Sequence, residues 1–345
     1  MINTLIADGC PVTRSMLRDF FEGGENFKII GEAADGQDAI DKILSLNPDL
    51  VTLDIELSKK NGFEVIEEAM KKTSVPIVVI TNNDSAKNAY EATVKGALEF
   101  YSKAVFSASL PAEKRREIYE TLRRISGVKS RKKESDAPVL NEEPSREIRA
   151  VVIASSTGGP KALAAFFALL PGNFHPPVVI VQHNSSGFDQ SFAQWLATHT
   201  KLNVKLAEEG EPLKPGTVYV ARTDKHLELR RKGAESDDCR FFYNDEAPQH
   251  NQKPAADVLF KTAAESLKNA LVSVVLTGMG SDGAAGTAAV REMGGVTLAQ
   301  DEETSFIYGM PKAAAETGCV DKVLPLDKIP AELARLASAM AAAGQ

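Results

Sequence analysis

Two stretches of this chain alternate short apolar runs with amphipathic segments, and this alternation restricts the possible folds more than any other feature. In the first stretch, the apolar runs predict strands at residues 4–7, 28–32, 50–53, 76–81 and 99–101. Helical spacing of apolar residues predicts helices at 11–21, 36–46, 62–71, 84–95 and 111–125. Because strands that alternate with helices build parallel sheets, we expect a doubly wound parallel-sheet domain over residues 1–125.

A second alternation begins at Ile148, after a segment without apolar periodicity. Residues 126–147 are rich in Ser, Pro, Lys, Arg and Glu, which is typical of a charged linker. Beyond it we expect strands at 150–154, 178–181, 217–221 and 271–277, and helices at 161–170, 189–199, 255–268 and 284–293. A chain of 345 residues is long enough for two domains, so residues 148–345 are expected to form a second doubly wound parallel-sheet domain.

The charge and cysteine content exclude several classes of protein. A net charge of −7 gives no support for nucleic-acid binding or for attachment to a membrane. The three cysteines are far apart and odd in number, which argues against a disulfide framework or a zinc site. The N-terminus lacks the pattern of a signal peptide, and no apolar run approaches membrane-spanning length. We therefore expect a cytoplasmic protein with no membrane insertion.

Residues 154–160, Ala-Ser-Ser-Thr-Gly-Gly-Pro, form the most informative loop. They follow an apolar run and precede a helical pattern, and Ala154-x-Ser156-x-Gly158 is close to a nucleophile elbow with alanine in place of the first glycine. The following helix offers free N–H groups that suit an oxyanion. Taken alone, the loop is equally consistent with an anion-binding or merely tight turn at a helix start.

A serine nucleophile needs a base and a group that orients the base. Of the five histidines, His183 follows the apolar run 177–182, at the carboxyl end of an expected strand. Asp282 follows the run 271–276 and a glycine-rich turn, where it could alternatively cap the next helix. Because ligands bind beyond the carboxyl ends of parallel strands, we expect Ser156, His183 and Asp282 to converge. The glycine-rich turn before Asp282 lacks the lysine and the third glycine of nucleotide-binding motifs, which argues against a nucleotide-binding protein.

These motifs together resemble the effector domain of the chemotaxis protein-glutamate methylesterases. The resemblance extends from residue 148 to about residue 326 and rests on residues 154–159, 182–183, 218–221, 226–229, 276–286, 299–302 and 308–311. It implies a Rossmann-like methylesterase domain that hydrolyses glutamate methyl esters, and deamidates glutamines, on chemotaxis receptors without a cofactor. It selects Ser156 rather than Ser155 as nucleophile, with His183 as base and Asp282 as its orienting partner.

The same resemblance implies further roles and contains one departure. The backbone N–H of Met279 is expected to help bind the oxyanion, and Thr157 is expected to support the site. Family members usually carry a histidine and a serine in the stretch that here reads Asn-Gln-Lys-Pro-Ala-Ala-Asp, residues 251–257. The substrate-binding loop is thus expected to differ from that of the family.

Residues 1–125 resemble a response-regulator receiver, which implies a flavodoxin-like fold. Asp54 ends a buried run where receivers place the phosphoacceptor, and Gly62 lies eight residues further on. Thr81 matches the switch hydroxyl, and Lys103 matches the lysine that contacts the phosphoryl group. A loop carboxylate at a strand end is the plainer interpretation of Asp54, but its spacing to Thr81 and Lys103 favours phosphorylation.

The receiver resemblance has a departure at its metal site. Receivers carry two adjacent acids after the first strand, whereas this chain has Asp8 and Gly9. Mg²⁺ needs oxygen ligands, so we expect Asp8 and Asp54 to hold it weakly, with Glu56 as a possible third carboxylate. Lys103 also lacks the usual following proline.

Two accounts of regulation follow from the sequence. In the first, a chemotaxis histidine kinase is the phosphodonor for Asp54, and phosphorylation of the receiver uncovers an active site that acts on methyl-accepting receptors. In the second, the substitution at Gly9 has left a phosphorylation-independent receiver that docks or inhibits.

Overall fold

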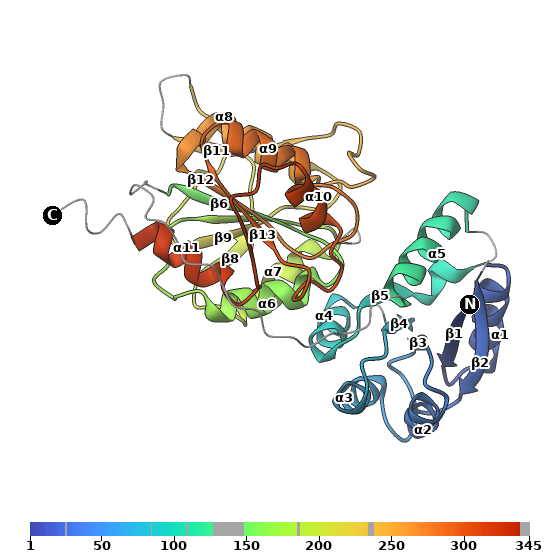
Figure 1. Cartoon of the computed structure of the whole chain (residues 1–345). Helices are drawn as coiled ribbons and strands as arrows, with labels where there is room; N and C mark the ends of the chain where they lie inside the picture. The colour runs from blue at the N-terminus through green and yellow to red at the C-terminus, as the bar shows by residue number, and fades with distance from the viewer. Residues whose placement is uncertain are drawn as a thin grey trace. The chain divides into compact units, whose positions relative to one another are not determined.

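The computed structural model of the chain describes residues 1–24, 26–83, 85–107, 110–126, 148–184, 187–233 and 238–338. The chain divides into two compact units, Met1–Arg131 and Lys132–Gln345, drawn in blue to cyan and in green to red respectively in Figure 1. The expected linker at 126–147 lies outside the described residues, apart from Ser126 at the end of the first unit's last helix.

The first unit is a five-stranded parallel sheet with the strand order β2-β1-β3-β4-β5. Its strands are β1 (Ile2–Ala7), β2 (Phe27–Ala33), β3 (Leu50–Leu53), β4 (Ile77–Thr81) and β5 (Glu99–Ser102). Its helices are α1 (Pro11–Glu22), α2 (Gly36–Leu46), α3 (Gly62–Lys72), α4 (Ala86–Lys95), the 3-10 helix η1 (Lys103–Phe106) and α5 (Ala112–Ser126). This strand order is that of the flavodoxin-like folds, as predicted.

Local sequence explains where these elements lie. The central strands β3 and β4 are buried at every position, which is why all but one residue of each strand is apolar. Helix α3 begins with a capping box between Asn61 and Glu64. Helix α4 begins at Ala86 rather than at the expected residue 84, because Ser85 caps it by accepting a hydrogen bond from the N–H of Asn88.

The second unit is a seven-stranded parallel sheet with the order β14-β13-β12-β6-β7-β9-β8. Its strands are β6 (Ala150–Ser155), β7 (Val178–Gln182), β8 (Asn203–Leu206), β9 (Thr217–Val220), β12 (Leu271–Val275), β13 (Val296–Gln300) and β14 (Lys322–Leu324). The order changes direction between β6 and β12, and the crevice beyond the carboxyl ends of strands at such a point is where ligands bind.

Helices and one hairpin cover this sheet. The helices are α6 (Gly159–Leu169), α7 (Asp189–Ala197), α8 (Ala256–Leu267), the 3-10 helix η2 (Lys268–Ala270), α9 (Ala284–Glu292), α10 (Met310–Glu316) and α11 (Ile329–Ser338). The antiparallel hairpin of β10 (His226–Arg231) and β11 (Cys239–Asn244) is not among the strands expected from the sequence. The predicted fold class of two doubly wound parallel-sheet domains is confirmed.

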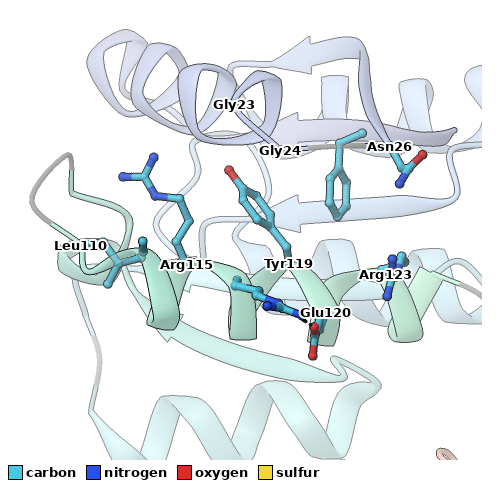
Figure 2. Close-up of a pocket in the computed structure, with 11 residues that line it drawn as sticks. Gly23, Gly24, Asn26, Leu110, Arg115, Tyr119, Glu120 and Arg123 are labelled. Atoms are coloured by element: carbon cyan, nitrogen blue, oxygen red, sulfur yellow. Dashed lines mark hydrogen bonds and ion pairs between the residues drawn. The ribbon is translucent and has the colours of Figure 1, made fainter.

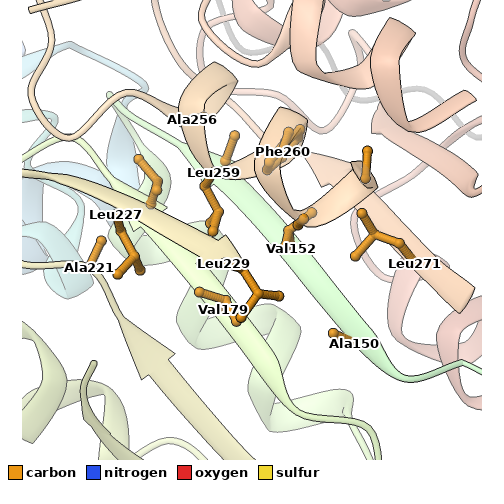
Figure 3. Close-up of a cluster of buried hydrophobic side chains, with 14 of the residues drawn as sticks. Ala150, Val152, Val179, Ala221, Leu227, Leu229, Ala256, Leu259, Phe260 and Leu271 are labelled. Atoms are coloured by element: carbon orange, nitrogen blue, oxygen red, sulfur yellow. The ribbon is translucent and has the colours of Figure 1, made fainter. Parts of the chain in front are cut away.

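The core of the second unit joins the hairpin, α8 and the sheet. Figure 3 shows Leu227 and Leu229 of β10 beside Leu259 and Phe260 of α8, with Val152 of β6 and Val179 of β7 beneath them. All of these side chains are fully buried. The start of α8 is therefore held against the sheet by apolar contacts along the rest of the helix.

Two general features bear on the class of protein. Within the part of the chain that the structure describes, no helix combines the length and apolarity needed to cross a lipid bilayer. The three cysteines, Cys10, Cys239 and Cys319, are all free thiols.

Candidate active site

The two serines of the loop after β6 have different surroundings. Ser155, the last residue of β6, is fully buried, and its Oγ donates a hydrogen bond to Gln182 Oε1 at 2.6 Å. Ser156 is the first residue beyond the strand and is partly exposed, and its N–H donates to the carbonyl of Thr277 at 3.1 Å. A nucleophile must be reachable by its substrate, so the structure favours Ser156 over Ser155 for this role.

The backbone around Ser156 depends on glycines. Gly158 has a φ of +78° and stands at the N-cap of α6, where a side chain would meet Phe306. A Cβ on Gly278 would lie 2.8 Å from the Cβ of Ser156 and 2.3 Å from Met310 Sδ. The turn after β12 therefore packs directly against Ser156, which brings the neighbouring Met279 to the same edge of the sheet.

His183 is held beside the serine loop by Gln182. The backbone N–H of His183 donates to the carbonyl of Ser155 at 3.0 Å, one residue beyond the paired positions Ser155 and Gln182. The side-chain Nε2 of Gln182 donates to the carbonyls of Ser156 at 3.1 Å and His183 at 2.9 Å. The buried side-chain amide of Gln182 thus fixes the backbone of the loop after β6 and of the loop after β7.

Asp282 contacts the His183 ring and accepts four hydrogen bonds. His183 Nε2 lies 2.8 Å from its Oδ2. The backbone N–H groups of Ala256, Asp257 and Gly283 donate to the same carboxylate at 2.7, 2.9 and 3.0 Å. Burial opposes ionisation of Asp282, but His183 and the amides at the start of α8 outweigh it and lower its pKa below the ordinary 3.8.

This arrangement determines the protonation of His183. An ionised carboxylate only accepts hydrogen bonds, so the proton on His183 resides on Nε2. The lone pair then resides on Nδ1, which is buried and has no hydrogen-bond partner among the residues that the structure describes. Only 5% of the His183 side chain is exposed. An imidazole oriented by a carboxylate, with its other nitrogen unprotonated, can act as a general base.

The remaining residues expected at this site lie close by. Thr157 is buried, and its carbonyl accepts a hydrogen bond from Thr277 Oγ1 at 3.1 Å, which ties the serine loop to the end of β12. Met279 is partly exposed in the turn that packs against Ser156. Ser156, His183 and Asp282 therefore come from three adjacent strand ends, those of β6, β7 and β12.

Sequence reasoning assigned no individual role to two residues that shape the site, Gln182 and Asp257. Gln182 was available as a polar residue at the end of a buried strand, but its partners are not predictable from its position. Asp257 in the first turn of α8 accepts a hydrogen bond from the N–H of Gly286 in α9 at 2.6 Å and faces His250 Nε2 at 2.9 Å. Asp282 and Asp257 thus satisfy amides at the starts of α8 and α9 reciprocally.

The predicted phosphorylation site lies in the first unit. Asp54 follows β3, Asp8 follows β1, and both are almost fully buried. Lys103 Nζ pairs with Asp54 Oδ2 at 2.6 Å and with Asp8 Oδ2 at 2.7 Å. Burial raises the pKa of Asp8, and Lys103 and the N–H of Cys10 offset this only partly. Burial disfavours the charge of Lys103, but the two carboxylates outweigh it and raise its pKa.

The surroundings of this cluster bear on metal binding. Gly9 is exposed, and among the described residues a Cβ there would meet only the carbonyl oxygens of Ala34 and Glu56, at 3.7 and 4.0 Å. Glu56 is exposed and accepts a hydrogen bond from Asn83 Nδ2 at 3.3 Å, while the N–H of Asn83 donates to Thr81 Oγ1 at 3.2 Å. Two buried carboxylates fit Mg²⁺, which is held in many proteins by one or two carboxylates and water.

A separate groove in the first unit contains none of these residues. Figure 2 shows it between the end of α1 and helix α5, with Tyr119, Arg115 and Arg123 along α5 and Gly23 and Gly24 opposite. Its volume is about 700 Å³. Because Asp8, Asp54, Thr81 and Lys103 are all absent from its lining, the groove is not part of the predicted phosphorylation site.

The fold and the site define a class: an α/β domain with a serine, a histidine and an aspartate at the carboxyl edge of a parallel sheet, joined to a flavodoxin-like domain. The family model described as CheB methylesterase matches residues 151–333, and that described as response regulator receiver domain matches residues 4–113. The chain therefore belongs to the CheB methylesterase family.

Individual relatives agree with this assignment. A protein-glutamate methylesterase/protein-glutamine glutaminase of Pyrococcus abyssi is 37% identical over 97% of this chain and 93% of its own length. Its counterpart in Thermotoga maritima is also 37% identical, over 97% of this chain and 98% of its own length. The crystal structure of the Thermotoga maritima CheB methylesterase catalytic domain covers 55% of this chain and 100% of its own, with 43% identity and a TM-score of 0.53.

Proposed function

We propose that the protein hydrolyses glutamate methyl esters, and deamidates glutamines, on chemotaxis receptors in the cytoplasm, with Ser156 as the nucleophile. Its family membership supports the substrate class. The observation that carries the catalytic assignment is the pairing of His183 Nε2 with Asp282 at 2.8 Å, which leaves Nδ1 as the unprotonated nitrogen.

In the first half of the reaction, Ser156 Oγ attacks the ester carbonyl carbon, and its proton moves to His183 Nδ1. The backbone N–H of Met279 stabilises the oxyanion, and Thr157 supports the serine loop. The tetrahedral intermediate collapses by breaking the bond to the methoxy oxygen, which takes the proton from His183 and leaves as methanol. The product of this half is an acyl-enzyme on Ser156.

In the second half, water attacks the acyl carbon and gives its proton to His183. Breaking the bond to Ser156 Oγ returns that proton to the serine and releases the glutamate side chain as a carboxylic acid, which loses its remaining proton to water and becomes a carboxylate. For a glutamine substrate, ammonia replaces methanol as the leaving group. Asp282 stays ionised throughout and stabilises the imidazolium that forms in each half.

Regulation is proposed to begin at Asp54. A chemotaxis histidine kinase donates a phosphoryl group to the Asp54 carboxylate, and Lys103 and Thr81 contact that group. Asp8 and Asp54 would hold Mg²⁺, which neutralises phosphate charge during transfer. Phosphorylation then raises the activity of the second unit.

A second candidate keeps the same catalytic chemistry but makes the receiver independent of phosphorylation. Gly9 in place of an acid favours it, because this removes one carboxylate from the metal site. Lys103 also already pairs with both remaining carboxylates. In this case the first unit docks the enzyme or inhibits it permanently.

The test measures methanol release from methylated receptor membranes, with and without a small phosphodonor and Mg²⁺. Release should fall at least about 10³-fold in Ser156→Ala. Phosphodonor should stimulate the wild type but not Asp54→Asn. Equal release with and without phosphodonor would support the second candidate, and a fully active Ser156→Ala would refute the catalytic proposal.

The proposed contribution of Glu56 to the metal site has its own test. Titration of Mg²⁺ into the wild type and Glu56→Ala should show weaker binding in the variant. Equal affinities would exclude Glu56 as a ligand and would agree with its observed hydrogen bond to Asn83.

A further inference from the structure

We propose that His226 is a positioning residue for catalysis, because it holds the first turn of α8 in the place from which that turn binds Asp282. The inference rests on the proposed function, since it assigns His226 a role in orienting the catalytic aspartate. His226 is the first residue of β10 and belongs to the second unit. It does not contact the reacting groups and would act only through the backbone of α8.

His226 is fully buried, and both of its ring nitrogens contact backbone groups. The N–H of Ala255 donates to Nδ1 at 3.1 Å, and Nε2 lies 3.1 Å from the carbonyl of Ala247. A backbone N–H can only donate and a carbonyl can only accept. His226 is therefore the neutral tautomer that carries its proton on Nε2.

The hydrogen bond to Nδ1 satisfies the N-cap of α8. The first N–H groups of a helix have no partner within the helix, and the N-cap residue Ala255 has no side chain that could supply one. Two side chains from distant parts of the chain take over this function. His226 accepts from Ala255, and Asp282 accepts from the next two amides, those of Ala256 and Asp257.

Three consecutive amides thus connect His226 to the catalytic aspartate. Both oxygens of Asp282 are oriented by this turn, because Ala256 donates to Oδ2 and Asp257 donates to Oδ1. Oδ2 is also the atom that faces His183 Nε2. A shift of the turn would therefore move the carboxylate relative to the imidazole.

The apolar contacts of this region do not replace the hydrogen bond. Leu227 and Ala256 belong to the buried cluster in Figure 3, which holds β10 and α8 together from the side of the sheet. Apolar packing is non-directional, so it keeps the two elements close without orienting an N–H. The directional contact at Ala255 is the one with His226 Nδ1.

Two isosteric variants separate the functions of the two ring nitrogens. In His226→Asn the side-chain oxygen can take the place of Nδ1 as acceptor. In His226→Gln the side-chain amide can take the place of Nε2 as donor, but the acceptor for Ala255 is lost. We expect kcat for methanol release to stay within about fivefold of wild type in His226→Asn and to fall about 10- to 100-fold in His226→Gln.

The Michaelis constant separates positioning from substrate binding. Because His226 is buried and does not reach the substrate, KM should change by less than about threefold in both variants. Ser266→Ala is the matched control: it removes a buried hydrogen bond from α8 to the carbonyl of Leu229 in β10, at the other end of the helix. It should lower the melting temperature as much as His226→Gln while leaving kcat unchanged.

A spectroscopic measurement makes the inference independent of enzyme activity. In the full chain with ¹⁵N-labelled histidine, the Nε2–H signal of His183, assigned by its loss in His183→Gln, reports the hydrogen bond to Asp282. It should shift in His226→Gln and stay in place in His226→Asn and Ser266→Ala. If the signal shifts as expected while wild type releases no methanol, the positioning role stands and the proposed function fails. An unmoved signal with unchanged kcat in a folded His226→Gln would overturn the inference.

Discussion

The Oδ2 atom of Asp282 lies 2.8 Å from Nε2 of His183, so the aspartate binds one ring nitrogen and leaves the other, Nδ1, without a hydrogen-bond partner among the described residues. The carboxylate is set in place by backbone amides from the starts of two helices, α8 and α9. A positive helix end favours a negative charge, which adds to the effect of the hydrogen bonds. These hydrogen bonds and the helix ends therefore stabilise the ionised form of Asp282 in the free protein.

The first prediction concerns the pH dependence of stability. The native pKa of Asp282 is lowered from 3.8, so its contribution to folding is fully present above about pH 4 and is lost as the pH falls further. The stability difference between wild type and Asp282→Asn should therefore be largest near neutral pH and shrink below about pH 4. Urea unfolding of both chains at about pH 6 and about pH 3 measures this difference. A difference that does not change between these two pH values would contradict the prediction.

The second prediction concerns Gln182, whose side chain donates hydrogen bonds to the backbone carbonyls of Ser156 and His183. Gln182→Met keeps the length of the side chain but removes its polar atoms. Small displacements of catalytic groups are costly, so kcat should fall about 10- to 100-fold with little change in KM. Thr297→Val in β13 removes partly buried hydrogen bonds from the threonine hydroxyl to the carbonyl of Cys319 and the carboxylate of Asp321, so it is the control for general destabilisation. Equal losses of activity in the two variants would show that Gln182 has no special role.

The third prediction concerns Gly159 in the first turn of α6. A Cβ at this position would lie 2.1 Å from Gln182 Oε1 and 3.0 Å from Ser155 Cβ. Gly159→Ala should destabilise the chain by about 1–3 kcal/mol through overpacking and should also lower kcat by displacing Gln182. In Gly233→Ala the added Cβ meets no atom of the described residues within 4 Å, so the free energy of unfolding should change by no more than about 0.5 kcal/mol. Thermal unfolding and methanol release together check both variants.

The fourth prediction concerns the receiver. Gly9→Asp restores an acid where the Cβ has ordinary van der Waals room. Two unit charges about 4 Å apart attract each other by about 1 kcal/mol in water, and Mg²⁺ carries two charges, so the Mg²⁺ affinity should rise about tenfold or more. Calorimetric titration of Mg²⁺ into the full chain gives the affinity, with Gly9→Asn as the uncharged control. Unchanged affinity in Gly9→Asp would mean that the pairing of Lys103 with Asp8 and Asp54, and not the missing acid, limits metal binding.

Much of the fold was predictable because both sheets are parallel and their central strands are buried on both faces. β3, β4, β6 and β12 are therefore mostly apolar in the sequence, with a single buried threonine or serine in each. The strands β8, β13 and β14 were not among the expected strands. Of the hairpin, only a possible strand start at His226 was considered, because β10 and β11 mix charged and apolar residues.

The convergence of Ser156, His183 and Asp282 was predictable for a topological reason, since carboxyl ends of parallel strands meet at one edge. The supporting contacts were not. The hydrogen bond between His226 and Ala255 joins residues 29 positions apart, and it depends on how the hairpin packs against α8. The partners of Gln182 likewise depend on the exact register of β6 and β7.

The most direct test of the central claim is to map the nucleophile with a fluorophosphonate, which reacts with an activated serine. After labelling of the full chain and digestion, mass spectrometry should find the phosphonyl group on Ser156. Labelling should be lost in His183→Gln and should persist in Ser155→Ala. A label on Ser155, or equal labelling of Ser156 in wild type and His183→Gln, would contradict the assignment of Ser156 as a nucleophile activated by His183.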